Sequence, residues 1–202
     1  MKRRVLLTGF GPFAGVESNP SEVVVARLKD TVFTAIDLRT HVLDVSYRRS
    51  VQQVDELVKK HVPELVIHLG VARSTPYLRV EARAVNLKGS DLTDVDGERG
   101  LGRPVQEEEE VGTLRYSSFG VESLVRDFER AGFPAQVSMD AGRYVCNAVY
   151  YHSLRLLEQA DTPCLFLHVP AVDDFWTLKR QHHAVLFMLN RMEKGESKPS
   201  TS

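Results

Sequence analysis

The chain carries the stretch SMDAGRYVCN at residues 138–147, in which a turn leads into a long apolar segment. Asp140-Ala141-Gly142 is typical of a turn, and apolar residues recur at helical spacing from Tyr144 to Leu157. Cys146 therefore lies at the start of a predicted helix, where backbone N–H groups are unpaired and the helix dipole is positive. Both features favour a thiolate, so we expect a lowered thiol pKa and a nucleophilic cysteine. The alternative is a cysteine that packs as a small buried hydrophobic residue.

Around this stretch, predicted strands alternate with predicted helices. Short apolar runs predict buried strands at 4–8, 64–70, 135–138 and 164–168, and two strands joined by a polar turn are expected at 32–38 and 41–45. In residues 77–86, apolar residues occupy every second position from Leu78 to Ala84, and this alternation indicates a strand or extended arm. Helices are predicted at 20–28, 48–62, 120–131, 144–157 and 176–192. This pattern predicts one α/β domain over residues 1–195, a three-layer α/β/α sandwich with a mostly parallel (mixed) central sheet, followed by a flexible tail at 196–202.

The composition excludes several classes of protein. The chain has 202 residues, 43% of them apolar, and a net charge of −1. That length and apolar content suit a single globular domain, and the near-zero charge gives no sign of a nucleic-acid or membrane surface. The first apolar run, 5–7, is too short for a signal peptide, and no run approaches the roughly 20 residues that cross a bilayer. Because there are only two cysteines, we expect a cytoplasmic protein, with a Cys146–Cys164 bridge as the alternative.

Three residues at or after predicted strands have the chemistry of a thiol hydrolase. Cys146 follows the strand at 135–138, His168 ends the strand at 164–168, and Glu81 lies in the extended segment at 77–86. Active groups of α/β sheets gather at the carboxyl ends of strands. A cysteine, a histidine and a carboxylate supply a nucleophile, a proton carrier and a group that orients the imidazole.

Each of these residues also has a structural interpretation. His168 could be a hydrogen-bonded core histidine, and Glu81 could be a half-exposed strand carboxylate. His68 lies in another buried strand and is a rival for the base. The acidic run at 107–110 is interpreted as a solvated surface.

The loop at residues 9–15, GFGPFAG, is the second informative stretch. Its glycines resemble a phosphate-binding loop, which would make the chain a nucleotide-binding module. However, the dinucleotide spacing is broken at Phe13-Ala14, Pro12 removes a donor amide, and no Lys-Ser/Thr follows. Phe10 and Phe13 on a tight loop favour the wall of an apolar pocket instead.

Four motifs, in this order, resemble the pyroglutamyl peptidase I (pyrrolidone-carboxylate peptidase) family. The resemblance extends from about Val5 to Pro170. The motifs are Leu7 to Gly15 with Asn19-Pro20, His68 to Val71 leading to Val80-Glu81 and Ala84-Val85-Asn86, Asp140 to Asn147 with Tyr150-Tyr151 and Ser153-Leu154, and Phe166-Leu167-His168-Val169-Pro170.

The resemblance implies a cysteine peptidase that removes an N-terminal pyroglutamyl residue from peptides and releases 5-oxoproline. It implies Cys146 as nucleophile, His168 as general base and acid, and Glu81 as the residue that orients His168. It also implies no cofactor and no metal, and a homo-oligomer, either a tetramer or a dimer. An amidase that acts on another small acyl group is the alternative. The implied substrate-binding residues are Phe10, Phe13, Asn19, Leu92, Tyr144 and Val145.

The chain departs from the family pattern at three places. Ala14 replaces a usual glycine, Asp91 occupies the place of an arginine thought to assist the oxyanion, and Ser74-Thr75 replace a Gly-Arg pair, with Arg73 nearby. Without the arginine, we expect the oxyanion to depend more on the backbone amides around Cys146.

Overall fold

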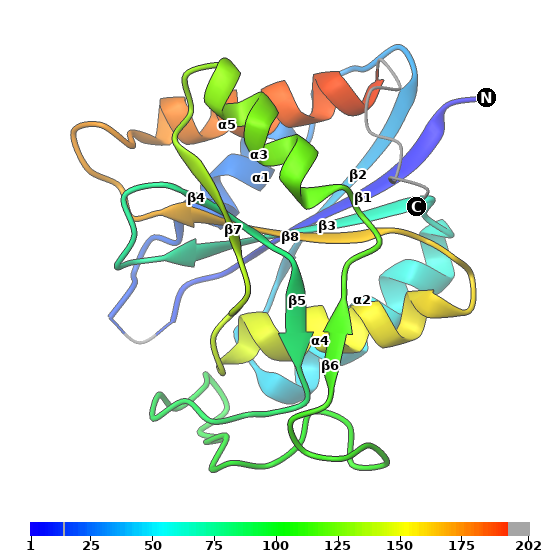
Figure 1. The fold of residues 1–202 in the computed structure, drawn as a ribbon, viewed down its shortest axis with the longest axis vertical. Coiled ribbons are helices and arrows are strands. Elements are labelled where there is room, and N and C mark those ends of the chain that lie inside the picture. Colours follow the sequence, from blue (N-terminus) through cyan, green and yellow to red (C-terminus); the bar gives the residue numbers. More distant parts are fainter. Residues whose placement is uncertain (14, 194–202) are drawn as a thin grey trace.

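A computed structural model describes residues 1–13 and 15–193. These residues form five helices and eight strands, with a six-stranded central sheet in the order β2-β1-β3-β8-β4-β7 (Figure 1). The strands are β1 (Arg3–Phe10), β2 (Ile36–Leu43), β3 (Leu65–Ala72), β4 (Leu78–Glu81), β5 (Arg83–Val85), β6 (Leu114–Tyr116), β7 (Ala135–Ser138) and β8 (Cys164–Pro170). The helices are α1 (Pro20–Leu28), α2 (Tyr47–His61), α3 (Val121–Arg130), α4 (Val145–Glu158) and α5 (Leu178–Glu193).

The sheet is mostly parallel, and its one antiparallel pairing lies beside the predicted site. Strands β2, β1, β3 and β8 run in one direction, whereas β4 and β7 are parallel to each other and β4 pairs antiparallel with β8. The predicted α/β fold with a mixed, mostly parallel sheet is confirmed. Residues 196–202, the predicted tail, lie outside the described residues.

Alternate residues of each strand face opposite helix layers. One apolar core contains Leu7, Ile67 and Leu167 together with residues of α1, α3 and α5. The other contains Leu6 and Phe166 together with residues of α2 and α4. Figure 1 shows the two layers on opposite sides of the sheet. Because side chains alternate in a strand, both faces of the central strands must be apolar, and this accounts for their continuous apolar runs.

The strand predictions at 32–45 and 77–86 were wrong in detail, and one short strand was missed. The segments at 32–38 and 41–45 are not two strands: β2 is one strand that pairs with β1 along its whole length. It lies at the sheet edge, where polar side chains such as Arg39 reach solvent without cost, so the polar stretch does not break it. Residues 77–86 divide into β4 and β5, because the chain leaves the main sheet after Glu81. The short strand β6, which contains no apolar run that would predict it, pairs with β5.

The long segment after β5 is anchored by Asn86. Its side-chain Nδ2 donates to the carbonyls of Gln106, Glu109 and Glu110, and its Oδ1 accepts from the amides of Val105 and Gln106. One buried side chain thereby closes a loop of some twenty residues. Within the described residues, no helix is long and apolar enough to cross a membrane.

Candidate active site

One row of residues across the sheet sets the position of His168. In the pairing of the strands, Gly70 of β3 lies opposite His168 of β8, which lies opposite Arg79 of β4. The missing side chain of Gly70 makes room for the imidazole. A Cβ added there would lie 2.9 Å from His168 Cδ2 and 3.0 Å from His168 Nε2, closer than such contacts normally occur. Gly70 thus fixes where the imidazole can lie.

His168 is held by a fully buried carboxylate. Its Nδ1 lies 2.8 Å from Glu81 Oε1, and the Glu81 side chain is 0% exposed. A carboxylate only accepts hydrogen bonds, so Nδ1 carries a proton and is the donor in this contact. Arg79 Nε lies 3.1 Å from the same Oε1, while Oε2 has no hydrogen-bond partner among the described residues. A single oxygen of the carboxylate, Oε1, therefore contacts both the imidazole and the guanidinium.

Arg79 also connects this carboxylate to the segment that precedes Cys146. Its Nη2 donates to Ser138 Oγ at 2.6 Å and to the carbonyl of Asp140. Ser138 is the last residue of β7, and Asp140 lies in the segment between β7 and α4. Arg79 is thus a bridge between the residue that orients His168 and the turn that leads to the cysteine.

The start of α4 is positioned by its neighbours. Gly142 has φ of +82°, a conformation that favours glycine, and the chain turns there toward the helix. Asn147, in the first turn, donates to the carbonyls of Val85 and Leu87 and accepts from the Val85 amide. No side chain caps the helix at Tyr144, so the first amides of α4 remain available to a ligand.

The predicted lowering of the Cys146 pKa was wrong. Burial raises the pKa of the thiol to about 12, and the negative charge of Glu81 adds to this effect, although its own backbone amide opposes it. Desolvation by the surrounding apolar groups therefore outweighs the helix start. At neutral pH this environment favours the thiol over the thiolate. Cys146 and Cys164 are both free, so the alternative of a bridge is wrong.

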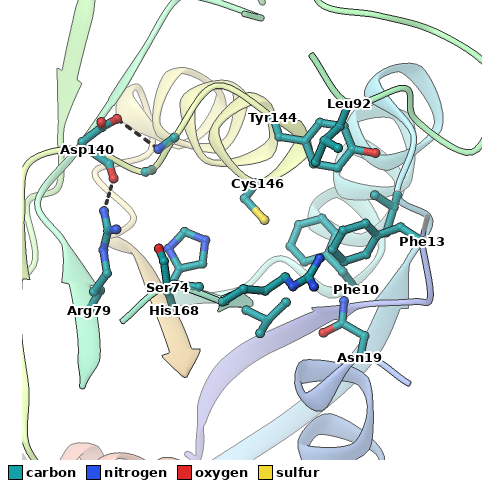
Figure 2. Close-up of a pocket in the computed structure, with 16 residues that line it drawn as sticks. Phe10, Phe13, Asn19, Ser74, Arg79, Leu92, Asp140, Tyr144, Cys146 and His168 are labelled. Carbon is teal, nitrogen blue, oxygen red and sulfur yellow. Dashed lines mark hydrogen bonds between the residues drawn. The ribbon is translucent and has the colours of Figure 1, made fainter. Parts of the chain in front are cut away.

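Cys146 and His168 face a common cavity of about 300 Å³. Figure 2 shows the sulfur between His168 on one side and Phe10 and Phe13 on the other. Of the nine predicted site residues, seven line this cavity: Phe10, Phe13, Asn19, Leu92, Tyr144, Cys146 and His168. The rings of Phe13 and Tyr144 lie 6.0 Å apart and form one apolar wall. The two predicted residues outside the lining are Glu81, which lies behind His168, and Val145.

Two of the predicted substrate-binding residues, Val145 and Asn19, have side chains engaged within the protein. Val145 is completely buried in the core between α4 and the sheet and does not reach the cavity, because the first helical residue points inward. Asn19 lines the cavity, but its side chain organises the glycine loop: Nδ2 donates to the Gly11 carbonyl, and Oδ1 accepts from the amide and hydroxyl of Ser21. Both of its polar atoms therefore make hydrogen bonds within the protein.

Sequence reasoning missed several residues of the lining. Val45, the segment 71–74, Arg79 and the turn 140–142 also face the cavity. Segment 71–74 covers the end of β3 and the residues after it, and Val45 follows the end of β2. The signal was available, since the carboxyl ends of parallel strands meet at one edge of a sheet. Arg79 gave no such signal, because its place depends on the antiparallel pairing of β4.

The rival interpretations do not match this geometry. His68 is fully buried, and its ring nitrogens lie 2.7 Å from Thr8 Oγ1 and 2.9 Å from Ser153 Oγ. Burial lowers its pKa to about 3, so the imidazole stays neutral. It is not among the residues that line the cavity. In the glycine loop, the amides of Phe10, Gly11 and Phe13 already have acceptors within the protein. They cannot hold a phosphate. Across residues 1–13 and 15–193, no cluster of three or more potential metal ligands occurs.

The fold and this pocket define a class: α/β proteins with the cysteine, histidine and carboxylate set of thiol hydrolases. The family model for pyroglutamyl peptidase matches residues 3–192. Pyrrolidone-carboxylate peptidase from Bacillus cereus (strain 03BB102) is 30% identical over 171 residues, 83% of this chain and 78% of the relative. The chain belongs to the pyroglutamyl peptidase family.

Solved structures of the family share this fold. The crystal structure of pyrrolidone carboxyl peptidase from Fervidobacterium islandicum AW-1 matches with a TM-score of 0.89 at 31% identity, over 96% of this chain and 99% of that chain. Pyroglutamyl peptidase I from Bacillus amyloliquefaciens matches with a TM-score of 0.86 at 25% identity, over 93% of each chain.

Proposed function

We propose that this chain is a cysteine peptidase that hydrolyses the bond after an N-terminal pyroglutamyl residue and releases 5-oxoproline. The observation that carries the proposal is the shared cavity, in which Cys146 and the Glu81-bound His168 face Phe10 and Phe13. A pyroglutamyl ring is small, uncharged and without a free amine. An apolar slot of aromatic side chains suits such a ring, whereas a free amino terminus would need an anion.

The proposed reaction begins with proton transfer from Cys146. His168 Nε2 takes the thiol proton while Sγ attacks the acyl carbonyl, so the thiolate need not accumulate in advance. The developing oxyanion is stabilised by the uncapped amides at the start of α4. Asp91 is exposed and does not line the cavity, so its negative charge does not oppose the oxyanion from within the pocket.

Leaving-group departure and deacylation use the same imidazole. The His168 Nε2–H protonates the leaving amine, and the C–N bond breaks to leave a thioester on Cys146. His168 then removes a proton from water, which attacks the thioester and releases the acid. Throughout, Glu81 keeps the proton on Nδ1 and stabilises the imidazolium.

The activity is tested with a fluorogenic pyroglutamyl amide. We expect release of the fluorophore, loss of activity after iodoacetamide treatment, and competition by 2-pyrrolidone, which mimics the ring. Absence of hydrolysis would overturn the proposal. Hydrolysis that 2-pyrrolidone does not inhibit would point instead to an amidase for a different acyl group.

We propose three further properties of this chain. The chain acts as one domain over residues 1–195, because the two cores share a single sheet. It works in the cytoplasm, where its two free thiols stay reduced. It forms a homo-oligomer, a tetramer or a dimer, and exposed apolar residues such as Leu101 and Val111 are available for contacts between subunits.

Gly70→Ala is expected to lower kcat/KM on the pyroglutamyl amide by roughly 10- to 1,000-fold, because a displacement of about 1 Å at a reacting group can cost 100-fold. The added methyl group would push against His168 and Phe166, which both lie within 3.0 Å of it. The matched control is Gly89→Ala, whose nearest neighbour would be 3.5 Å away. Circular dichroism of both variants verifies folding, and a folded Gly70→Ala with wild-type kcat/KM would contradict the argument.

A further inference from the structure

Two arginines line the cavity, and their surroundings differ. Arg79 is fully engaged: it contacts Glu81 and donates to Ser138 and to the Asp140 carbonyl. Arg73, the first residue after β3, is exposed and has no hydrogen bond or ion pair within residues 1–13 and 15–193. A Cβ placed on Gly15 would lie 3.8 Å from Arg73 Nη1, so the guanidinium reaches across the mouth of the cavity to the loop that carries Phe13.

Among the lining residues that the structure describes, Asp140 is the one carboxylate, and it is already bound. Asp140 accepts from the Gly142 amide at 3.0 Å and pairs with Arg143. Although burial acts in the opposite direction, these hydrogen bonds lower the pKa of Asp140, so it stays ionised and occupied. Among the described residues that line it, the cavity thus presents one free cation, Arg73, and no free anion. A ligand that carries a carboxylate is favoured there, and a ligand with a free amine is not.

We infer that Arg73 is a specificity residue that binds a carboxylate on the leaving side of the substrate. This inference rests on the proposed function. The acyl residue fills the aromatic slot and carries no charge, so the carboxylate must belong to the residue that leaves. Two sources share this chemistry: the terminal carboxylate of a pyroglutamyl dipeptide and the side chain of a leaving Asp or Glu. A guanidinium forms paired hydrogen bonds with either.

The test compares matched substrates at low ionic strength. One pair is pyroglutamyl-glutamate amide against pyroglutamyl-glutamine amide, and the other is pyroglutamyl-alanine against its amide. For at least one pair we expect wild-type kcat/KM to favour the carboxylate by about three- to tenfold, as for an exposed charge-assisted contact, and to lose most of this preference at about 1 M salt. The pair that responds identifies the source of the carboxylate.

The variants are Arg73→Gln, Arg73→Lys and the control Arg126→Gln. Arg126 is exposed on α3, which lies on the face of the sheet opposite to α4. Arg73→Gln should bring the ratio within the responding pair close to the intrinsic ratio of the two leaving groups, Arg73→Lys should retain part of the preference, and Arg126→Gln should retain all of it. Because each ratio is compared with that of the wild type, differences in leaving-group chemistry cancel.

Two failures are distinguishable. If the wild type hydrolyses both members of each pair but the ratios do not change in Arg73→Gln, the inference about Arg73 is overturned and the proposed peptidase stands. If the wild type hydrolyses none of the four peptides and not the fluorogenic amide, the proposed function itself fails. An equal loss on all four substrates in Arg73→Gln would assign the residue a structural role and also overturn the inference.

Discussion

Cys146→Ala is expected to reduce kcat/KM for the pyroglutamyl amide by on the order of 10⁴- to 10⁶-fold, as removal of a covalent nucleophile does in other acyl-transfer enzymes. Without the sulfur no thioester forms, and the pocket retains only binding and the amides at the start of α4. Because Cys146 contacts the cavity and not the centre of the core, the variant should fold and still bind 2-pyrrolidone. Rates are measured at substrate concentrations below KM, after a check of folding by circular dichroism.

The matched control is Cys164→Ala. Cys164 begins β8, is 1% exposed, and burial raises its pKa far above the usual range. This variant should keep kcat/KM within about threefold while losing about 1–2 kcal/mol of stability to a small cavity. Activity that survives Cys146→Ala, or disappears only in Cys164→Ala, would exclude the proposed nucleophile.

Glu81→Gln is expected to lower kcat by roughly 10²- to 10⁴-fold with little change in KM, following the size of the effect when the carboxylate of such a triad is neutralised. The amide group can turn its NH₂ toward His168 Nδ1 and so leave the only ring proton on Nε2, the wrong tautomer for a base. It also removes the charge that stabilises the imidazolium and leaves Arg79 without its partner 3.1 Å away. The change is nearly isosteric, so the effect reports on charge and tautomer.

Kinetics of Glu81→Gln are compared with those of Glu56→Gln, an exposed position on α2. Only the first substitution should affect kcat. A loss smaller than about fivefold in a folded Glu81→Gln would mean that His168 is oriented by other contacts. The tilted contact with Phe166, whose ring centroid lies 4.6 Å from that of His168, would then be the next candidate.

The sequence was sufficient for the features that depend on local pattern. Continuous apolar runs located β1, β3 and β8, and the turn before Tyr144 located the start of α4. The Asn19-Pro20 signal located α1, whose N-cap is Asn19. These features are local because a buried strand must be apolar on both faces and a helix start needs a cap or a turn.

The remaining features depend on pairing between distant segments. That β4 runs against β8, and so brings Arg79 beside His168, cannot be inferred from residues 78–81 alone. The direction of the Cys146 pKa shift also depends on the depth at which α4 is buried, not on its sequence. Val145 illustrates the same point: it is adjacent to the cysteine in sequence, but helical geometry points it into the core.

The antiparallel pair β4–β8 has a consequence for changes in chain length. Glu81 lies opposite Phe166, and it reaches His168 diagonally across the pair. Because side chains alternate along a strand, inserting or deleting one residue within β4 would turn the carboxylate toward α3 and α5, where Val80 and Leu167 pack. The turn at residues 73–77 has no such constraint. Substitutions and insertions there can vary which peptides are accepted while the contact between Glu81 and His168 is kept.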